Sequence, residues 1–354
     1  MIRLALVLIL FALRAGAGPL APEAVAHYGP AGAPSPLLVR GTTDIALFAP
    51  VLRAFATANP LVRIDYEQWG SNELYQAAAK ACAGLFAAAD LVISSAVDQQ
   101  VKLVNDGCTQ AHRSAATTAL HEDRNWRDEV FGITREPAVM VYNRRLVPPA
   151  EAPRSRFDLL DLLRPEGSRY AGRVATYDIG QSGLGYLFAF ADSQQATTFG
   201  SLMEAFGRTH AVATCCSAEI IDGVASGRYL IAYNVLGSYA LARAARDPEL
   251  VVVAPEDYTL ILSRAALIPK EARHPATAGR FVDFMLSPAG RQALRATRLI
   301  VDPPDLDGEA SGGGDGRNAT LLRPVPLSPV LLVGLDRQRR ERFIALWRKT
   351  FQQP

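Results

Sequence analysis

The chain has 354 residues, of which 49% are hydrophobic and 20% are charged, a composition typical of a globular protein large enough for two domains. Its formal net charge of +2 is too small to indicate a nucleic-acid or membrane-surface partner. Aromatic residues also do not alternate with basic runs, as they do in a groove for single-stranded nucleic acid. We therefore expect no nucleic-acid partner.

Residues 1–17 predict a secretory signal peptide. Arg3 precedes an apolar stretch over residues 4–13, and the small residues at 15–17 provide a cleavage site near Ala17. The stretch is shorter than the roughly 20 residues that span a bilayer, although an uncleaved anchor is the alternative. We expect an exported mature chain in which residues 18–36, rich in Pro, Gly and Ala, form a disordered lead-in.

Four cysteines follow, and an even number in an exported chain permits disulfide bonds. A bond between Cys82 and Cys108 would stabilise the fold by roughly 3–4 kcal/mol in the chain-entropy description, but the sequence leaves this pairing open. Cys215 and Cys216 are adjacent and near His210, yet the set lacks the spacing of a zinc site. We predict that these two are small buried side chains, and that the protein holds no metal and no cofactor.

The first part of the chain alternates strand patterns with helical ones. Phe48, Val51 and Phe55 recur at helical spacing, whereas Val62 and Ile64 alternate with polar residues. In chain order the patterns predict a strand at 37–40, a helix around 48–55, a strand at 62–66, a helix at 74–82 capped by Ser71, a strand at 91–93 and a helix at 97–104 that stops at Gly107.

The second part begins with an apolar segment at 134–143, which we interpret as a crossover between two lobes. The patterns after it predict helices at 157–163 and 217–226, strands at 173–177, 229–233 and 250–254, a return crossover at 255–262, and helices at 277–286 and 289–297. Residues 303–316 contain a Gly-Gly-Gly run and are typical of a flexible linker. Apolar positions among arginines over 331–351 predict a docked terminal helix with a solvated basic face; a basic partner-binding helix is the alternative.

Four small polar or glycine-rich loops each follow a strand and open a helix: GTTD at 41–44, SSA at 94–96, GQSGLG at 180–185 and NVLGS at 234–238. A helix N-terminus carries unpaired N–H donors and a partial positive charge, so it suits an anion or a hydroxyl. Strand-loop-helix units predict an α/β fold, in which ligands bind beyond the carboxyl ends of the strands. These loops therefore predict a binding cleft.

The sequence offers no catalytic set. It contains neither the GxSxG turn of a hydrolase nor the GxxxxGK[ST] loop of a nucleotide-binding protein, and Ser182 in GQSGLG has the wrong glycine spacing for the former. The five histidines are scattered, without a pair at metal-binding spacing. We predict that the protein is not an enzyme.

Several segments resemble the periplasmic solute-binding proteins of ABC transport systems, of the two-lobed type II with two crossover strands. They are residues 41–44, DLVISSAVDQQVKLVNDG at 90–107, TREPAVMVYN at 134–143, GRYLIAYNVLGSYA at 227–240 and FVDFMLSPAGRQ at 281–292. Within that superfamily the chain is similar to the ferric-iron-like cluster and to the phosphoglycerate transport regulatory type. The resemblance implies an α/β fold with a ligand cleft between the lobes, and a place in the periplasm.

The resemblance also implies how the chain is divided. The expected parts are a signal peptide at 1–17, the lead-in at 18–36, lobe one at 37–135, lobe two at 136–255, the return of lobe one at 256–302, the linker at 303–316, and a C-terminal helix at 317–354 docked on lobe one.

The same resemblance assigns candidate ligand contacts to positions of this sequence. They are Thr42, Thr43, Asp44, Ser94 and Ser95 from lobe one, Arg135 and Glu136 at the crossover, and Ser182, Gly183, Tyr186, Tyr233, Asn234 and Tyr239 from lobe two. Arg135 is the first choice for holding an anion, because a guanidinium offers two parallel donors; a salt bridge to Glu136 is the alternative. Iron-binding relatives use adjacent tyrosines, and this chain has no such pair.

These observations predict a monomeric binding protein that captures a small anionic solute, phosphorylated or carboxylated, and delivers it to an inner-membrane ABC permease. Two alternatives stay open at this stage. One is a sensing accessory that docks on a membrane histidine kinase, and the other is a ferric iron-binding protein.

Overall fold

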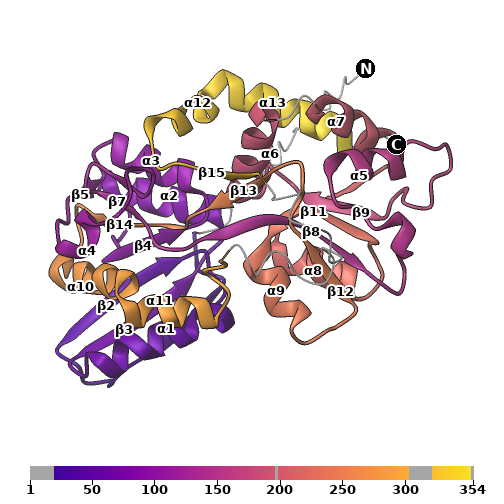
Figure 1. Ribbon diagram of the computed structural model, residues 1–354. Helices are drawn as coiled ribbons and strands as arrows, with labels where there is room; N and C mark the ends of the chain where they lie inside the picture. The colour runs from indigo at the N-terminus through magenta and orange to yellow at the C-terminus, as the bar shows by residue number, and fades with distance from the viewer. Residues whose placement is uncertain (1–19, 196–197, 303–320, 352–354) are drawn as a thin grey trace, which may run out of the picture.

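A computed structural model describes residues 20–195, 198–302 and 321–351. Two mixed sheets, each packed with helices, form two lobes joined by a hinge (Figure 1). This arrangement confirms the predicted two-lobed α/β fold. The predicted signal peptide and linker lie outside the described residues. Within the described ranges, no helix has both the length and the apolar character that crossing a membrane requires.

Lobe one is built on a sheet in the order β1-β3-β2-β4-β14-β7-β6, with β5 paired to β14. Its strands are β1 (Ala24–Tyr28), β2 (Ser35–Gly41), β3 (Val62–Gln68), β4 (Leu91–Ser94), β5 (Thr109–Gln110), β6 (Asn125–Trp126), β7 (Val130–Gly132) and β14 (Ala265–Pro269). Its helices are α1 (Ile45–Ala58), α2 (Ser71–Cys82), α3 (Val97–Asn105), α4 (Ala115–Thr118), α10 (Pro275–Leu286) and α11 (Pro288–Ala296). The β2–β3 and β2–β4 pairs are parallel, so these strands end at one edge.

From residue 20 onward the lead-in of lobe one is ordered, contrary to the predicted disorder; residues 18 and 19 lie outside the described residues. Strand β1 pairs antiparallel with β3, with Ala24 opposite Gln68 and Tyr28 opposite Ile64. Alternation within AVAHY, in which Val25 and His27 are exposed and Tyr28 packs against the lobe-one core, supports this strand. The proline- and glycine-rich composition concealed a short edge strand.

Lobe two has the sheet order β10-β9-β11-β8-β13-β15, with β12 paired to β8. Its strands are β8 (Glu136–Asn143), β9 (Val174–Tyr177), β10 (Val212–Thr214), β11 (Ile231–Leu236), β12 (Leu250–Val253), β13 (Thr259–Leu262) and β15 (Leu322–Pro324). Its helices are α5 (Arg156–Leu163), α6 (Gly183–Gln195), α7 (Phe199–Arg208), α8 (Ser217–Ala225) and α9 (Gly237–Ala244). Strand β8 lies between β11 and β13 in this sheet, and its eight residues are all buried.

The chain crosses between the lobes from β7 to β8 and again from β13 to β14. In the first crossing, β8 begins at Glu136, the residue at which the sequence predicts the start of lobe two. The second occurs later than predicted: β13 still pairs with β8 in lobe two, and lobe one resumes at Ala265. Residues 256–262 therefore belong to lobe two, because apolar residues in a crossover strand do not reveal which sheet they pair with.

The fourth predicted loop, at 234–238, is not a loop. Strand β11 continues to Leu236, with an irregularity in its pairing to β8 between Ala232 and Val235. Asn234 has a φ of +60°, a backbone conformation that asparagine tolerates better than most residues. The polar asparagine thus marks a bulge inside a strand, and α9 begins directly afterwards at Gly237.

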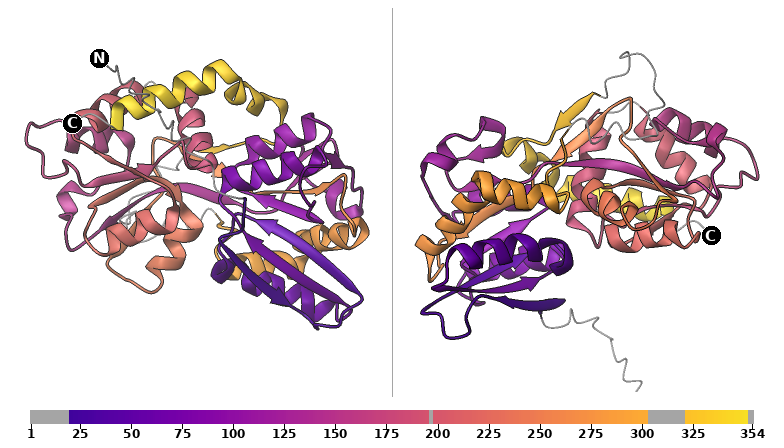
Figure 2. Two further views of the ribbon diagram at one scale, coloured as in Figure 1. Left: turned by 180° about the vertical axis from the view of Figure 1, so that it is seen from behind. Right: turned by 60° about the horizontal axis from the view of Figure 1, so that its bottom comes forward.

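The C-terminal segment, residues 321–351, lies across both lobes, whereas the sequence predicted docking on lobe one. Helix α12 (Leu332–Leu335) contacts α3 of lobe one, and α13 (Arg337–Phe351) contacts α7 of lobe two. Phe343 and Trp347 of α13 pack with Tyr186 in a lobe-two cluster. Figures 1 and 2 show these helices spanning the molecule from lobe to lobe.

Both pairs of cysteines are bonded. Cys82 at the end of α2 joins Cys108, which settles the pairing that the sequence left open. Cys215 and Cys216 form a disulfide between adjacent residues, and Cys216 is exposed. The prediction that these two are buried is wrong, because adjacency says nothing about which side of a loop faces solvent.

Candidate functional site

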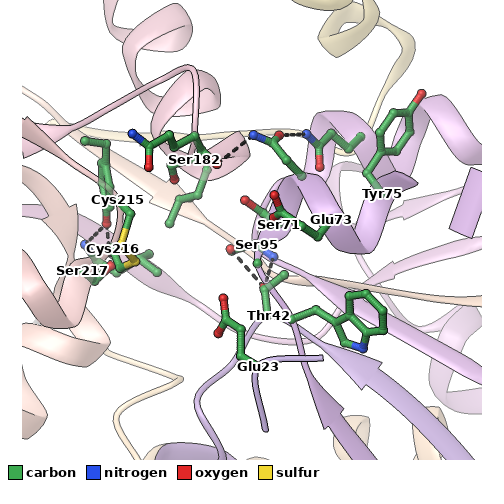
Figure 3. A pocket seen from close by; sticks show the side chains of 18 of the residues that line it. Glu23, Thr42, Ser71, Glu73, Tyr75, Ser95, Ser182, Cys215, Cys216 and Ser217 are labelled. Carbon is green, nitrogen blue, oxygen red and sulfur yellow. Dashed lines mark hydrogen bonds between the residues drawn. A yellow bond between two sulfur atoms is a disulfide. The ribbon is translucent and has the colours of Figure 1, made fainter. Parts of the chain in front are cut away.

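A cavity of about 990 Å³ lies between the lobes. Its lining comes from lobe one, lobe two, the hinge and the C-terminal segment. Figure 3 shows the two walls facing each other, with Cys215, Cys216 and Ser217 on one side and Thr42, Ser71 and Ser95 on the other. We call this cavity the cleft.

Hydroxyl side chains at the starts of helices line the cleft. They are Thr42 just before α1, Ser71 at the start of α2, Ser95 just before α3, Ser182 just before α6 and Ser217 at the start of α8. Each helix start adds a partial positive charge to the same space. Lobe one and lobe two contribute such groups together, so the cleft is suited to a negatively charged or hydroxylated solute.

A buried ion pair at the hinge, between Arg264 and Glu136, adjoins the cleft, and Arg264 is one of the lining residues. Arg264 Nε donates to Glu136 Oε1 at 2.8 Å and Nη2 donates to Oε2 at 3.2 Å. Burial by itself would lower the pKa of Arg264, but the carboxylate of Glu136 keeps that pKa above its ordinary value. Arg264 Nη1 faces Thr42 Oγ1 at 3.4 Å, and the same oxygen accepts from the N–H of Ser95 at 3.0 Å. The hinge pair therefore orients the hydroxyls of lobe one.

The lobes touch on both sides of the cleft. Tyr239 of lobe two donates its hydroxyl to Asp44 Oδ1 at 2.8 Å and accepts from the Asp44 N–H at 3.1 Å. Burial raises the pKa of Tyr239 well above its ordinary value, so this phenol stays protonated. Asn72 Nδ2 donates to the Gln181 carbonyl at 2.8 Å, and the Gly183 N–H donates to Ser71 Oγ at 2.9 Å. These contacts describe a closed arrangement of the lobes.

The structure brings part of the predicted set together. The predicted residues that line the cleft are Thr42, Asp44, Ser95, Ser182 and Tyr239. Those that do not line it are Thr43, Ser94, Arg135, Glu136, Gly183, Tyr186, Tyr233 and Asn234. Thr43, Ser94 and Gly183 each adjoin a lining residue in sequence, and Glu136 is paired with the lining Arg264.

Three of these residues take part in hydrogen bonds to main-chain groups around the cleft. The carbonyl of Thr43 accepts from the Tyr66 hydroxyl at 2.6 Å, and Ser94 Oγ accepts from the Ala96 N–H at 3.1 Å. Arg135 Nη1 donates to the Val301 carbonyl at 2.7 Å. Arg135, the residue first expected to contact an anion, therefore binds the main chain near the hinge and does not line the cleft.

The tyrosines and the asparagine of lobe two lie deeper than predicted. The Tyr186 hydroxyl donates to the Gly334 carbonyl in the C-terminal segment. Tyr233 accepts from Arg156 Nε at 2.8 Å and donates to Asp192 inside lobe two. Asn234 is buried, with its side-chain oxygen unpartnered among the described residues. Tyr233 and Asn234 belong to the irregular part of β11, whereas Tyr186 belongs to α6 and is held by the C-terminal segment.

Sequence reasoning missed several lining residues. Ser71 and Ser217 carry the same signal as Ser95, a hydroxyl at a helix start, and could have been found by it. Glu23 precedes the unexpected strand β1, and Arg340 belongs to the terminal helix, so no local pattern placed either one in the cleft.

One group of cleft residues has ligand atoms close enough to consider a metal. The sulfurs of Cys215 and Cys216 and a carboxylate oxygen of Glu219 lie within 4.8 Å of one another. Disulfide sulfurs are not thiolates, and the thiolate is the form of cysteine that ligates metals. Of this group only Glu219 offers a carboxylate, and the bonded cysteine pair forms a sulfur-rich part of the cleft wall.

Comparison with known proteins gives consistent matches. The family model described as bacterial extracellular solute-binding protein matches residues 37–297. The substrate-binding protein of an ABC transporter from Agrobacterium tumefaciens is 33% identical, with a TM-score of 0.85 over 94% of this chain and 99% of that one. Among the curated proteins, no sequence matches this chain.

More distant structures share the fold alone. The periplasmic binding protein AfuA from Actinobacillus pleuropneumoniae, with exogenous fructose-6-phosphate bound, is 16% identical with a TM-score of 0.70 over 91% of this chain and 100% of that one. Iron-bound HitA from Pseudomonas aeruginosa is 16% identical with a TM-score of 0.66 over 90% and 99%.

Proposed function

We propose that the solute of this protein is a small organic anion. The premise is that this chain belongs to the bacterial extracellular solute-binding proteins and acts as a substrate-binding protein of an ABC transporter. The observation that carries the proposal is the ring of hydroxyl-bearing helix starts from both lobes around one cleft. Such groups hold phosphate or carboxylate oxygens by hydrogen bonds and by the helix dipoles.

The charges of the cleft narrow the class of anion. Glu23, Asp44, Glu73 and Glu219 line the cleft beside Lys102, Arg264 and Arg340. A highly charged anion without donors would be repelled by those carboxylates, whereas hydroxyl groups would donate to them. We therefore favour a hydroxylated phosphate or carboxylate, and AfuA shows that this fold accommodates fructose-6-phosphate.

Ferric iron is the weaker candidate on this geometry. Tyr233, one of the candidate ligand contacts, is buried in lobe two and does not line the cleft. Tyr239 does line it, but its pKa is raised by burial and its hydroxyl is committed to Asp44. A phenolate ligand would need to overcome both effects.

Transport is favoured over sensing as the biological role. The Agrobacterium tumefaciens protein, which is 33% identical over nearly the whole chain, is a component of an ABC transporter. We expect the mature chain to work in the periplasm as a monomer and to present its closed lobes to a permease. Neighbouring genes for a permease and an ATPase would support this role, and genes for a kinase and a response regulator would contradict it.

A thermal-shift screen of the mature protein tests the solute class. The panel holds 3-phosphoglycerate, fructose 6-phosphate, citrate, inorganic phosphate, an amino acid, thiamin and ferric citrate. A ligand at one hundred times its Kd stabilises the folded state by about 2.7 kcal/mol. We expect hydroxylated phosphates or carboxylates to raise the Tm most. A shift with thiamin or the amino acid alone would overturn the anion proposal, and a visible absorption band with ferric citrate would favour iron.

A further inference from the structure

The C-terminal segment lies beyond the residues that match the family, which end at 297. It is nevertheless joined to both lobes. The Leu327 N–H donates to the Asp123 carbonyl of lobe one at 2.8 Å, and Tyr186 of lobe two donates to the Gly334 carbonyl. Strand β15 also extends the lobe-two sheet by pairing with β13. The segment is therefore an integral part of the closed molecule.

The segment also contributes to the wall of the cleft. Leu335 at the end of α12 and Arg340 in the first turns of α13 both line it. The guanidinium carbon of Arg340 lies 5.1 Å from the centroid of the Tyr186 ring, so the ring face positions the cation. The neighbouring basic residues Arg339 and Arg337 are exposed and do not line the cleft.

Arg340 differs from the other cations of the cleft in its partners. Lys102 is paired with Asp106, and Arg264 with Glu136. Among the described residues, no carboxylate lies within ion-pair or hydrogen-bond distance of the Arg340 guanidinium, so its five N–H donors are available to a solute.

The surroundings of Arg340 favour recognition of an anion. Tyr75 and Leu184 line the cleft with it, and Arg340 is itself half-buried, so water screens its charge incompletely. The buried carboxyl of Asp98 interacts electrostatically with Arg340, and burial raises the pKa of Asp98 to about 7. Near neutral pH that group is only partly ionised, so it neutralises little of the arginine's charge.

We infer that Arg340, supplied by the C-terminal segment, is a solute-contacting residue that binds the carboxylate or phosphate of the bound anion through its planar pair of N–H donors. The inference rests on the proposed function and assigns to Arg340 the role that the sequence suggested for Arg135. It makes the segment from 321 to 351 part of the binding site, with a contact that forms only when the segment lies across the lobes.

The test compares Arg340→Gln, Arg340→Lys and the matched surface variant Arg339→Gln in the full mature chain. Calorimetric titrations use 3-phosphoglycerate, fructose 6-phosphate and citrate. A hydrogen bond between charged groups contributes about 1.5–3 kcal/mol, so Arg340→Gln should weaken the best of these ligands by roughly 10- to 150-fold. Arg340→Lys should retain part of the affinity, and Arg339→Gln should match the wild type.

A further variant separates the charge from the docking of the segment. Tyr186→Phe removes the hydrogen bond to Gly334 but keeps the ring beneath Arg340. It should weaken binding less than Arg340→Gln does, with both proteins folded by circular dichroism.

The outcomes separate the inference about Arg340 from the proposed function. Wild-type affinity in Arg340→Gln, or an equal loss in Arg339→Gln, would overturn the inference and leave the anion proposal intact. Absence of binding of all three anions by the wild type would overturn both.

Discussion

The side chains of Arg156 and Arg264 are almost completely buried, and their surroundings differ. Arg156 in lobe two is 0% exposed and pairs with Asp192 at 2.9 Å and Asp257 at 3.1 Å. Arg264 at the hinge is 1% exposed and pairs with Glu136. Both pairs satisfy the rule that a buried charge needs a partner.

The difference lies in where the remaining donors point. Arg156 also donates to Tyr233 and to the Tyr258 carbonyl, so its hydrogen bonds end inside lobe two. Arg264 lines the cleft and turns Nη1 toward Thr42. The comparison indicates that the same buried chemistry stabilises one lobe in the first case and shapes the binding site in the second.

Replacing Arg156 should lower stability strongly without changing solute affinity. Arg156→Met leaves Asp192 and Asp257 without a cation, and breaking a buried pair in this way costs roughly 3–5 kcal/mol of unfolding free energy. Urea denaturation measures this loss. Solute affinity of the folded fraction should be unchanged, and the double variant Arg156→Met with Asp192→Asn should recover part of the stability. A large loss of solute affinity in folded Arg156→Met would contradict a purely structural role for Arg156.

Replacing Arg264 should affect both stability and binding. Arg264→Met should lower the unfolding free energy by roughly 3–5 kcal/mol, because Glu136 is left buried and unpaired. Adding Glu136→Gln should restore stability, since the neutral amide is cheaper to bury, but should not restore affinity. Recovery of both properties in the double variant would mean that Arg264 has only a structural role.

The two disulfides should differ in the same way, one affecting stability and the other solute binding, with smaller effects than the buried arginines have. Cys82→Ser with Cys108→Ser opens a long loop and should cost about 2–4 kcal/mol. Cys215→Ser with Cys216→Ser opens no loop between distant residues, so its effect on Tm should be slight while solute affinity changes. Equal losses of stability in the two double variants would contradict this assignment.

Asp98 provides the counterpart to Glu136, a buried carboxyl without an ion-pair partner among the described residues. Burial raises its pKa from 3.8 to about 7. The folded state then retains a proton that the unfolded state has lost between these values, so this contribution to stability is full below about pH 4 and is lost as the pH rises through 7. Asp98→Asn should remove this dependence and raise the unfolding free energy at pH 8 by up to about 4 kcal/mol, because one pKa unit corresponds to roughly 1.4 kcal/mol.

The control for that prediction is the pH profile itself. At pH 4 and below, wild type and Asp98→Asn should have nearly equal unfolding free energies, because the aspartic acid is neutral in both states. Parallel profiles from pH 4 to pH 8 would show that Asp98 ionises normally.

Much of the fold could be predicted from the sequence because strands and helices carry short-range periodic patterns. The alternation at Val62 and Ile64 and the helical spacing from Phe48 to Phe55 both correspond to elements β3 and α1. The resemblance to solute-binding proteins and the expectation that the chain is not an enzyme are confirmed by the family match.

The rest depended on long-range contacts that no local pattern contains. The apolar face of α13 was recognisable, but nothing near Phe343 or Trp347 in sequence specifies lobe two. Arg135 was favoured because it adjoins a crossover, whereas Arg340 reaches the cleft only through the packing of a segment beyond the family match. Ser71 was predicted to cap α2, and its hydroxyl instead accepts from Gly183 across the lobes.

The central claim, that a small anion binds in the cleft between the lobes, is tested most directly by filling that cleft. Ala218 lines it on α8, and Ala245 is exposed beyond α9, so Ala218→Trp and Ala245→Trp form a matched pair. Each is titrated by calorimetry with the anion that raises the wild-type Tm most. Our account predicts that Ala218→Trp loses binding while Ala245→Trp keeps the wild-type Kd. Wild-type affinity in Ala218→Trp would contradict it.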